Sequence, residues 1–174
     1  MIDMKVSEGG PDEVRDFLAM LHEHSSWLVP KRDHYLWEET DREDPPPIVE
    51  QVLRHARAGQ MRICWDVLTR VTGGSVLTET APEFAPEAEE PELYLHFLVT
   101  RVRYRPFTMA ALVADARAEA AQRGARLLRT HCWTSEDGRR VREYEELGFT
   151  ATVEFEQLRS DGSLWPGQLL QTWV

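Results

Sequence analysis

Apolar residues recur at regular intervals along the first half of the chain. Between positions 12 and 28, Val14, Phe17, Leu18 and Leu21 have the spacing of one helix face, and positions 48–58 repeat that pattern before Gly59. Shorter apolar runs bounded by glycine predict strands. In chain order the pattern predicts a strand at 4–7, helices at 12–28 and 48–58, and strands at 61–67 and 74–80 around a turn at Gly73-Gly74.

The second half of the chain contains two segments that are apolar almost throughout. Residues 93–101 (LYLHFLVTR) are typical of a central strand covered on both faces, and residues 125–133 have the same character. An alanine-rich helix predicted at 107–123 connects these two strands, so they should pair in parallel. A helix at 136–147 follows, and strands at 150–158 and 168–174 are predicted to form a terminal hairpin through residues 160–163.

These elements predict one α/β domain that spans residues 1–174. Their order is strand, two helices, three strands, helix, strand, helix and two strands. This order favours a mixed, mostly antiparallel sheet with helices on both faces. At 174 residues the chain suits one sizeable core, and it contains no linker long enough to separate domains.

Charge and cysteine content narrow the classes of function. The formal net charge of −10 argues against nucleic-acid partners, because such binding relies on lysine and arginine to neutralise phosphates. No apolar run approaches the roughly 20 residues that cross a bilayer, and the first ten residues lack the basic and apolar regions of a secretory signal. Cys64 and Cys132 have no metal-ligand spacing. We therefore expect two free thiols in a cytoplasmic protein without a metal or a membrane partner.

Charged residues of opposite sign are separated along the chain. Residues 79–92 (ETAPEFAPEAEEPE) combine acidic side chains with three prolines, and we expect a solvated loop there. Arginines instead gather at positions 101, 103 and 105 and again at 139, 140 and 142. An acidic protein with a basic centre suits a small anionic ligand better than an anionic polymer.

Residues 144–149 (YEELGF) close the helix predicted at 136–147. They resemble the Tyr-Glu-x-x-Gly-Phe pattern in which the fourth helix of the GNAT superfamily of N-acyltransferases often ends. A bacterial subgroup shares four further motifs in the same order: Leu95-His96, Cys132-Trp133, Asp137-Gly138 and Trp165-Pro166-Gly167-Gln168. The resemblance covers residues 93–174. The first half matches by the order of its elements, by Trp27-Leu28 and by Trp37.

The resemblance implies acetyl-CoA, or another acyl-CoA, as a co-substrate. The family binds it through backbone N–H groups at a helix N-terminus, in a loop that reads Gln/Arg-x-x-Gly-x-Gly/Ala. Residues 105–110 (RPFTMA) occupy that place, with Thr108 where glycine is usual and with Pro106, which has no N–H. The positions assigned to this site by resemblance are Leu98, Val99, Thr100, Arg103, Arg105, Phe107, Thr108, Met109, Ala110 and Asp137. On the structural alternative, Pro106 is a first-turn residue and the arginines form a solvated patch.

Amide formation defines the chemistry that such a site must perform. The amine must lose a proton before it attacks, and the thiolate must be protonated as it leaves. The oxyanion needs a donor, in this family a backbone N–H, here near Leu98–Thr100. By resemblance Tyr144 is the acid, and His96 on the predicted central strand is the candidate base. The alternatives are a Tyr144 that packs between Val141 and Leu147 and a His96 that is a hydrogen-bonded core residue.

Two further residues carry double interpretations. His131, at the end of the strand predicted at 125–133, is a second candidate base or another core histidine. Asp137 is interpreted as a capping residue of the helix that follows, and it can also approach the donor. Cys132 is not interpreted as a nucleophile, because no ordered Cys-His-Asx arrangement accompanies it.

The expected acceptor is the amine of a small metabolite. Its pocket would come from the first helices and their connection, with candidate lining residues Trp27, His34, Tyr35 and Trp37. Two other functions stay open. One is a GNAT-like domain that binds a ligand without turnover, which the altered loop at Pro106 and Thr108 favours. The other is an acyltransferase whose thioester donor is a carrier-protein arm. The terminal hairpin around Trp165 is a candidate homodimer contact.

Overall fold

The computed structural model describes residues 3–25, 47–134, 137–158, 162 and 164–174, and the predictions for Trp27, Leu28, His34, Tyr35 and Trp37 lie outside the described residues. The strands are β1 (Met4–Glu8), β2 (Met61–Asp66), β3 (Val71–Thr78), β4 (Glu92–Thr100), β5 (Leu127–Trp133), β6 (Thr150–Leu158) and β7 (Leu164–Trp173). The helices are η1 (Pro11–Glu13), α1 (Val14–Ser25), α2 (Pro47–Arg57), η2 (Val102–Tyr104), α3 (Arg105–Gln122) and α4 (Arg139–Glu146).

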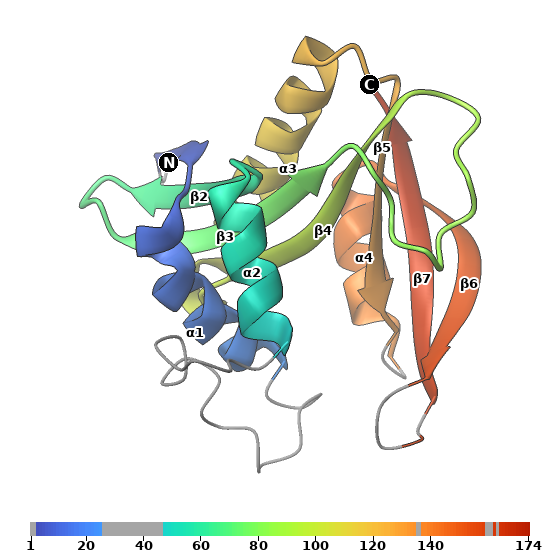
Figure 1. Ribbon diagram of the computed structural model, residues 1–174, viewed down its shortest axis with the longest axis horizontal. Helices are drawn as coiled ribbons and strands as arrows, with labels where there is room; N and C mark the ends of the chain where they lie inside the picture. The colour runs from blue at the N-terminus through green and yellow to red at the C-terminus, as the bar shows by residue number, and fades with distance from the viewer. Residues whose placement is uncertain (1–2, 26–46, 135–136, 159–161, 163) are drawn as a thin grey trace. The chain divides into compact units, whose positions relative to one another are not determined.

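The strands of the described residues form a seven-stranded sheet in the order β1-β2-β3-β4-β5-β7-β6 (Figure 1). β4 and β5 are parallel, as predicted, because α3 returns the chain to the end of the sheet from which β4 started. The pairs β1–β2, β2–β3, β5–β7 and β6–β7 are antiparallel. The predicted fold class, a mixed and mostly antiparallel sheet with helices, is therefore confirmed.

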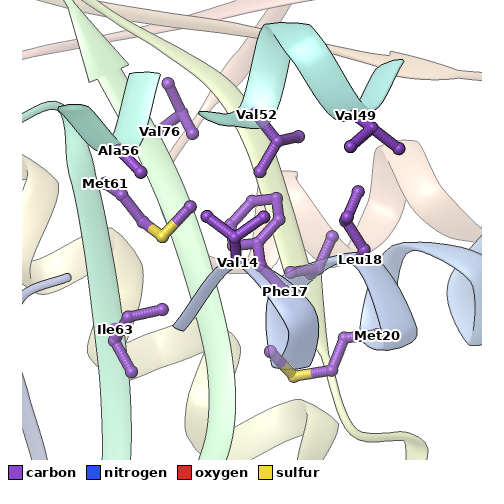
Figure 2. Packing of buried hydrophobic residues seen from close by; sticks show 11 residues of the cluster. Val14, Phe17, Leu18, Met20, Val49, Val52, Ala56, Met61, Ile63 and Val76 are labelled. Carbon is purple, nitrogen blue, oxygen red and sulfur yellow. The ribbon is translucent and has the colours of Figure 1, made fainter. Parts of the chain in front are cut away.

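The chain divides into two compact units, which we describe separately. The first comprises residues 1–76 and 97–112. Its core forms where the apolar faces of α1 and α2 meet β2 and β3, and Figure 2 shows Phe17 of α1 next to Val52 of α2 and Leu18 next to Val49. These side chains are fully or almost fully buried. Each buried side chain of this size contributes about 1.5–3 kcal/mol through the hydrophobic effect.

The predicted turn at Gly73-Gly74 is wrong, because both glycines lie inside β3. The turn between β2 and β3 covers residues 67–70 instead, and the Asp66 carboxylate holds it by accepting the N–H groups of Leu68 and Arg70, each at 2.9 Å. The two glycines serve close packing on opposite faces of the strand. A Cβ on Gly73 would overlap Thr108 of α3, and a Cβ on Gly74 would lie 2.8 Å from the Phe17 ring of α1. Helices therefore cover both faces of this unit.

The second unit comprises residues 77–96 and 113–174, with β5 between β4 and β7. β5 pairs in parallel with β4 from Glu92↔Leu127 to Leu95↔Thr130 and along its whole length with β7. The predicted terminal hairpin is confirmed, although β7 starts at Leu164, four residues before the predicted position. Gly167 of β7 faces Phe155 of β6, whose ring fills the space of the missing side chain.

The acidic segment 79–92 is only partly the solvated loop that we expected. It has no helix before β4, but the half-buried ring of Phe84 stacks on Phe155 with 4.4 Å between ring centroids. Its last residue, Glu92, opens β4 and forms a nearly buried ion pair with Arg129, whose Nη2 lies 2.9 Å from Oε1. Arg129 also donates to the carbonyl of Pro86 at 2.8 Å. An aromatic ring and an arginine thus fasten the segment to the second unit.

Both cysteines are buried and free, as predicted. Burial raises the pKa of Cys132 to about 12, so its thiol stays protonated at neutral pH. Among the described residues, no helix is long and apolar enough to span a membrane. The same part of the chain holds no group of three or more His, Cys, Asp or Glu that could bind a metal ion.

Candidate functional site

The segment between β4 and α3, in the first unit, is the candidate donor site. Most of its backbone N–H groups are already engaged. Arg101 donates to the Thr72 carbonyl at 2.8 Å, and Val102 donates to Oε1 of Glu23 at 3.3 Å. Tyr104 donates to the Arg101 carbonyl at 3.0 Å, and Arg105 donates to the Val102 carbonyl. The N–H of Arg103 takes no part in these four bonds.

The first turn of α3 offers few additional donors. The first four N–H groups of a helix have no partner inside it, and in α3 they belong to residues 104–107. Those of Tyr104 and Arg105 are used by η2, and Pro106 has none. Of these four residues, Phe107 is the remaining one whose N–H is not used by η2. The segment therefore has fewer N–H groups to offer than a loop whose successive N–H groups all face a diphosphate.

Thr108 points away from the surface of this site. Its side chain is fully buried beneath α3, against the position where Gly73 lacks a side chain, and its hydroxyl has no hydrogen-bond partner there. Met109 is also buried, whereas Phe107 is 51% exposed. The threonine in the glycine position thus packs on β3 without covering the helix N-terminus, and its hydroxyl is not presented to a ligand.

A pocket of about 590 Å³ lies beside this segment, within the first unit. Its lining residues are Asp16, Glu23, Trp65, Thr69, Arg70, Val71, Arg101, Val102, Arg103 and Tyr104. Arg101 lies 3.3 Å from Asp16 and 3.9 Å from Glu23, and Arg70 pairs with Asp66 at 2.8 Å. The guanidinium of Arg103 instead lies 5.9 Å from the centroid of the Tyr104 ring.

Four predicted donor-site residues lie at the end of β4 and at the start of α3. Arg105 is half-buried and donates from Nη1 to the Thr100 hydroxyl at 3.3 Å. Leu98, Val99 and Thr100 are the last three residues of β4 and lie beyond its last pair with β5, at Leu95. All three side chains are buried. Their contribution to an oxyanion site is through the backbone and stays a prediction.

Tyr144 lies in the last turn of α4, in the second unit, and its side chain is 6% exposed. Its ring meets the Phe149 ring edge-on, at 5.5 Å between centroids. Its carbonyl accepts the N–H groups of Leu147 and Phe149 at 3.0 and 3.1 Å, which close the helix end at Gly148, a residue with φ of +94°. Tyr144 is thus held firmly, and its acid role stays a prediction.

Arg117 of α3 fastens the same helix end. Its Nη2 donates to the Leu147 carbonyl at 2.7 Å and to the Thr172 hydroxyl at 3.3 Å, and its guanidinium lies 6.0 Å from the Phe149 ring centroid. A cation at the C-terminus of a helix is favourable because the carbonyl ends of its dipoles gather there. The glycine and phenylalanine of the 144–149 motif are therefore explained by packing.

His96 is anchored through its Nε2 atom. This atom lies 2.5 Å from the Thr78 hydroxyl and 3.1 Å from the Thr80 carbonyl. The Thr78 hydroxyl itself donates to the Thr80 carbonyl at 2.8 Å. A carbonyl only accepts, so Nε2 carries the proton. A base at this position would have to act through Nδ1.

The structure adds a residue that the sequence had not singled out, Tyr94. Its hydroxyl forms a hydrogen bond with Nδ1 of His131 at 2.9 Å. Burial lowers the pKa of His131 to about 4, with a smaller contribution from nearby His96, and burial raises the pKa of Tyr94 well above its ordinary value. His131 is therefore neutral at physiological pH, and its ring lies near those of Phe84, Trp133 and Phe155, at centroid distances of 4.9, 5.9 and 6.0 Å.

Asp137 has the capping role that its position predicted. Its Oδ1 accepts the N–H of Arg139 at 3.1 Å, at the start of α4. Its carbonyl also accepts from Nη1 of Arg142 at 2.5 Å. A contact with the donor stays a prediction.

Comparison with known proteins places the fold. No protein-family profile and no curated sequence matches the chain. Solved structures do match over nearly its whole length. A GNAT-family acetyltransferase from Listeria monocytogenes is 13% identical, covers 98% of this chain and 95% of its own, and has a TM-score of 0.67. The Drosophila melanogaster polyamine N-acetyltransferase is 14% identical, covers 99% and 100%, and has a TM-score of 0.64.

A third similar structure is the C-terminal condensation domain of Ebony in complex with beta-alanyl-dopamine. It is 12% identical, covers 100% of both chains and has a TM-score of 0.70. At these identities the likeness concerns the fold. The chain has the fold of the GNAT acetyltransferases, as the motifs at residues 93–174 led us to expect.

Proposed function

We propose that the protein is an N-acyltransferase that moves an acyl group from acetyl-CoA, or another acyl-CoA, to the amine of a small molecule. The observation that carries this proposal is the GNAT fold over 98% or more of the chain, together with a tyrosine held at the end of α4. The fold alone is compatible with several chemistries. The phenol at position 144 makes acyl transfer the best-supported one.

The reaction requires one bond to form and one to break. The neutral amine attacks the thioester carbonyl, a C–N bond forms, and the C–S bond breaks as the tetrahedral intermediate collapses. A backbone N–H near Leu98–Thr100 would stabilise the oxyanion. Tyr144 would protonate the departing thiolate, since phenols in general, with a pKa of about 10, can serve as acids toward thiolates with a pKa of about 8.5. The proton lost by the amine then restores the phenol.

Removal of the amine proton is the less defined step. His96 remains our candidate base through Nδ1, either directly or through a water molecule. Its Nε2 contact with Thr80 would fix the ring in the tautomer that leaves Nδ1 to accept. His131 is a poorer candidate, because its Nδ1 is already hydrogen-bonded to Tyr94 and burial disfavours its charged form.

The donor would be held at the start of α3. Arg103 and Arg105 would contribute guanidinium groups and Phe107 its backbone N–H, and the buried Met109 would keep the helix seated. Ala110 and Asp137 stay predicted contacts. A second candidate function is ligand binding without turnover. It is favoured by the engaged N–H groups of Tyr104 and Arg105, which leave fewer donors than the family motif provides.

The acceptor class follows from charge and from the similar proteins. The formal charge of −10 favours a cationic amine over an anionic one. The similar structures include a polyamine N-acetyltransferase and a domain bound to beta-alanyl-dopamine, so amines of both kinds belong in a substrate panel. We also propose a cytoplasmic protein without nucleic-acid or membrane partners, with the hairpin of β6 and β7 as a candidate dimer contact.

The test is a binding titration followed by a reaction. A ligand that binds the native state alone raises stability by RT ln(1 + [L]/Kd), about 2.7 kcal/mol at 100 times Kd. We expect CoA and acetyl-CoA to raise Tm in this way, and amines from the panel to release free thiol from acetyl-CoA. Binding of CoA without thiol release for any amine would favour the binding domain. Absence of both would refute the proposal.

A further inference from the structure

We infer that the pocket lined by α1, the β2–β3 turn and η2 binds a free amino acid with a large apolar side chain. Its volume of about 590 Å³ lies within the range of about 300–1,000 Å³ that is usual for small-molecule sites. All of its lining residues belong to the first unit. The inference goes beyond the proposed function and does not depend on acyl transfer.

Side chains of both charges line the pocket. Arg70, Arg101 and Arg103 supply positive charge, and Asp16 and Glu23 supply negative charge. A ligand with only an anionic group would approach two carboxylates, and a ligand with only a cationic group would approach three guanidinium groups. A ligand with both an ammonium and a carboxylate group can place each beside the opposite charge. The lining therefore favours a zwitterion over either single ion.

The carboxylate of the ligand would bind Arg103. Arg70 pairs with Asp66 at 2.8 Å, and Arg101 lies 3.3 Å from Asp16. Arg103 is exposed and forms no ion pair with any other described residue. Its planar guanidinium can therefore bind both oxygens of a carboxylate without displacing an acidic side chain.

The ammonium group of the ligand would bind Asp16 of α1. The Asp16 side chain is 49% exposed, and its Oδ1 atom contacts Arg101 at 3.3 Å. A carboxylate has about four acceptor positions, so Asp16 can accept from an ammonium group and keep its contact with Arg101. Glu23 follows two helical turns later on the same face of α1, and its Oε1 accepts the N–H of Val102 at 3.3 Å. It adds negative charge to the same wall.

The remaining wall of the pocket is largely apolar, and its residues are Trp65, Val71, Val102 and Tyr104. The polar ends of the two rings are engaged within the protein. Nε1 of Trp65 donates to the Ser7 hydroxyl at 3.2 Å, and the Tyr104 hydroxyl accepts from Nη2 of Arg70 at 3.3 Å. The rings therefore offer mainly apolar surface to a ligand, which favours a large apolar side chain over a charged one.

The turn that forms one side of the pocket is fixed before a ligand binds. Thr69 lines the pocket with φ of +58°, a left-handed conformation that β-branched residues rarely adopt. The Asp66 carboxylate holds the turn by accepting the N–H groups of Leu68 and Arg70. A fixed wall lowers the entropic cost of binding, since the loop does not have to be ordered by the ligand.

The test is a calorimetric titration of the full chain with phenylalanine and two truncated forms of it. Phenethylamine lacks the carboxylate, and 3-phenylpropionate lacks the ammonium group. We expect phenylalanine to bind at least about tenfold more tightly than either form, because each form loses one charge-assisted contact. Binding of either form within tenfold of phenylalanine would overturn the inference, since the site would then recognise a single ion. Absence of binding by phenylalanine, leucine and tryptophan alike would also overturn it.

Two variants assign the binding to this pocket. Asp16→Asn should weaken phenylalanine about tenfold and strengthen 3-phenylpropionate, because Arg101 loses a competing carboxylate. Arg103→Gln should weaken phenylalanine and 3-phenylpropionate and leave phenethylamine unchanged. The matched controls are Glu154→Gln and Arg126→Gln, exposed residues of the second unit, which should change none of these affinities. An unchanged affinity for phenylalanine in either pocket variant would contradict the assignment.

The result can be separated from the test of the proposed function. Thiol release from acetyl-CoA without binding of any amino acid would refute this site and leave the acyltransferase intact. Binding of phenylalanine with the expected response to the two pocket variants, but without binding of CoA or thiol release, would support the site and refute the acyltransferase.

Discussion

Gly73 of β3 lies directly beneath Thr108 of α3, so that a methyl group on the glycine would overlap Cγ2 of the threonine and lie 2.7 Å from the Val99 carbonyl oxygen. The pair explains how threonine is accommodated at a position where the family usually has glycine. The space that the helix residue takes is made available by a glycine in the strand. This contact therefore fixes the start of α3 against β3, and the candidate donor site lies at that end of the helix.

Gly73→Ala should destabilise the protein by about 1–3 kcal/mol, the usual cost of overpacking a filled core. Thr108→Ala in the same chain should restore only part of this stability, because the Val99 carbonyl still obstructs the methyl group. Thermal unfolding measures both. Gly10→Ala is the matched control, since its nearest neighbour would be 3.8 Å away, and it should have almost no effect. Equal Tm values for the variants at Gly73 and Gly10 would contradict the packing described here.

The free energy of unfolding should decrease as the pH is lowered from about 6.5 to about 4, because of His131. Its pKa is about 4 in the folded protein and about 6.5 when unfolded, so in this range the unfolded state binds the additional proton. One such group contributes a slope of up to about 1.4 kcal/mol per pH unit, with the stabilisation complete above pH 6.5. His131→Gln keeps an acceptor for Tyr94 and does not titrate. Denaturant unfolding at several pH values should show a shallower slope for this variant, and an unchanged slope would exclude His131 as its source.

The ion pair of Glu92 with Arg129 should be costly to break. Both side chains are close to buried, at 11% and 7% exposure, so Glu92→Gln leaves an uncompensated guanidinium and should cost about 3–5 kcal/mol. The exposed pair of Glu79 with Arg123 provides the comparison, because its atoms are 4.0 Å apart and Glu79 is 75% exposed. Glu79→Gln should cost less than about 1 kcal/mol. Similar losses in the two variants, measured by urea unfolding, would argue against this difference.

Arg117 should protect the end of α4. Arg117→Met removes the bonds to Leu147 and Thr172, and we expect the N–H groups of residues 147–149 to exchange with solvent at least tenfold faster. Arg117→Lys retains a cation at the helix end, so its exchange rates should lie between those of the native protein and those of Arg117→Met. Hydrogen exchange followed by NMR measures this directly. Unchanged protection at these positions in Arg117→Met would mean that the helix end is held by other contacts.

The elements with strong local signals were predictable from sequence. Two apolar segments with an alanine-rich helix between them predicted a pair of parallel strands. In the structure these strands are β4 and β5, and they pair in parallel. The glycine pair misled the prediction because glycine marks both turns and close approaches. The contact that decides between them, with Thr108, lies 35 positions away in the chain.

The chemistry of the candidate site was less accessible. Pro106 revealed the loss of one N–H, but the bond from Val102 to Glu23 joins residues 79 positions apart and has no local signal. Phe84 was hidden in an acidic, proline-rich segment, where composition predicted only solvent exposure. The Tyr94–His131 bond likewise depends on the register of two parallel strands.

The most direct measurement is the rate of thiol release from an acetyl thioester in the presence of an amine panel, for the native protein and for Tyr144→Phe. We expect native turnover with at least one amine, coupled to formation of one amide per thiol. Loss of the phenol should lower kcat about 100-fold or more, since general acids contribute factors of about 10² to 10⁴, while CoA affinity changes little. Equal kcat values in the two proteins would remove Tyr144 from the reaction. Absence of turnover with every amine and thioester would contradict acyl transfer itself.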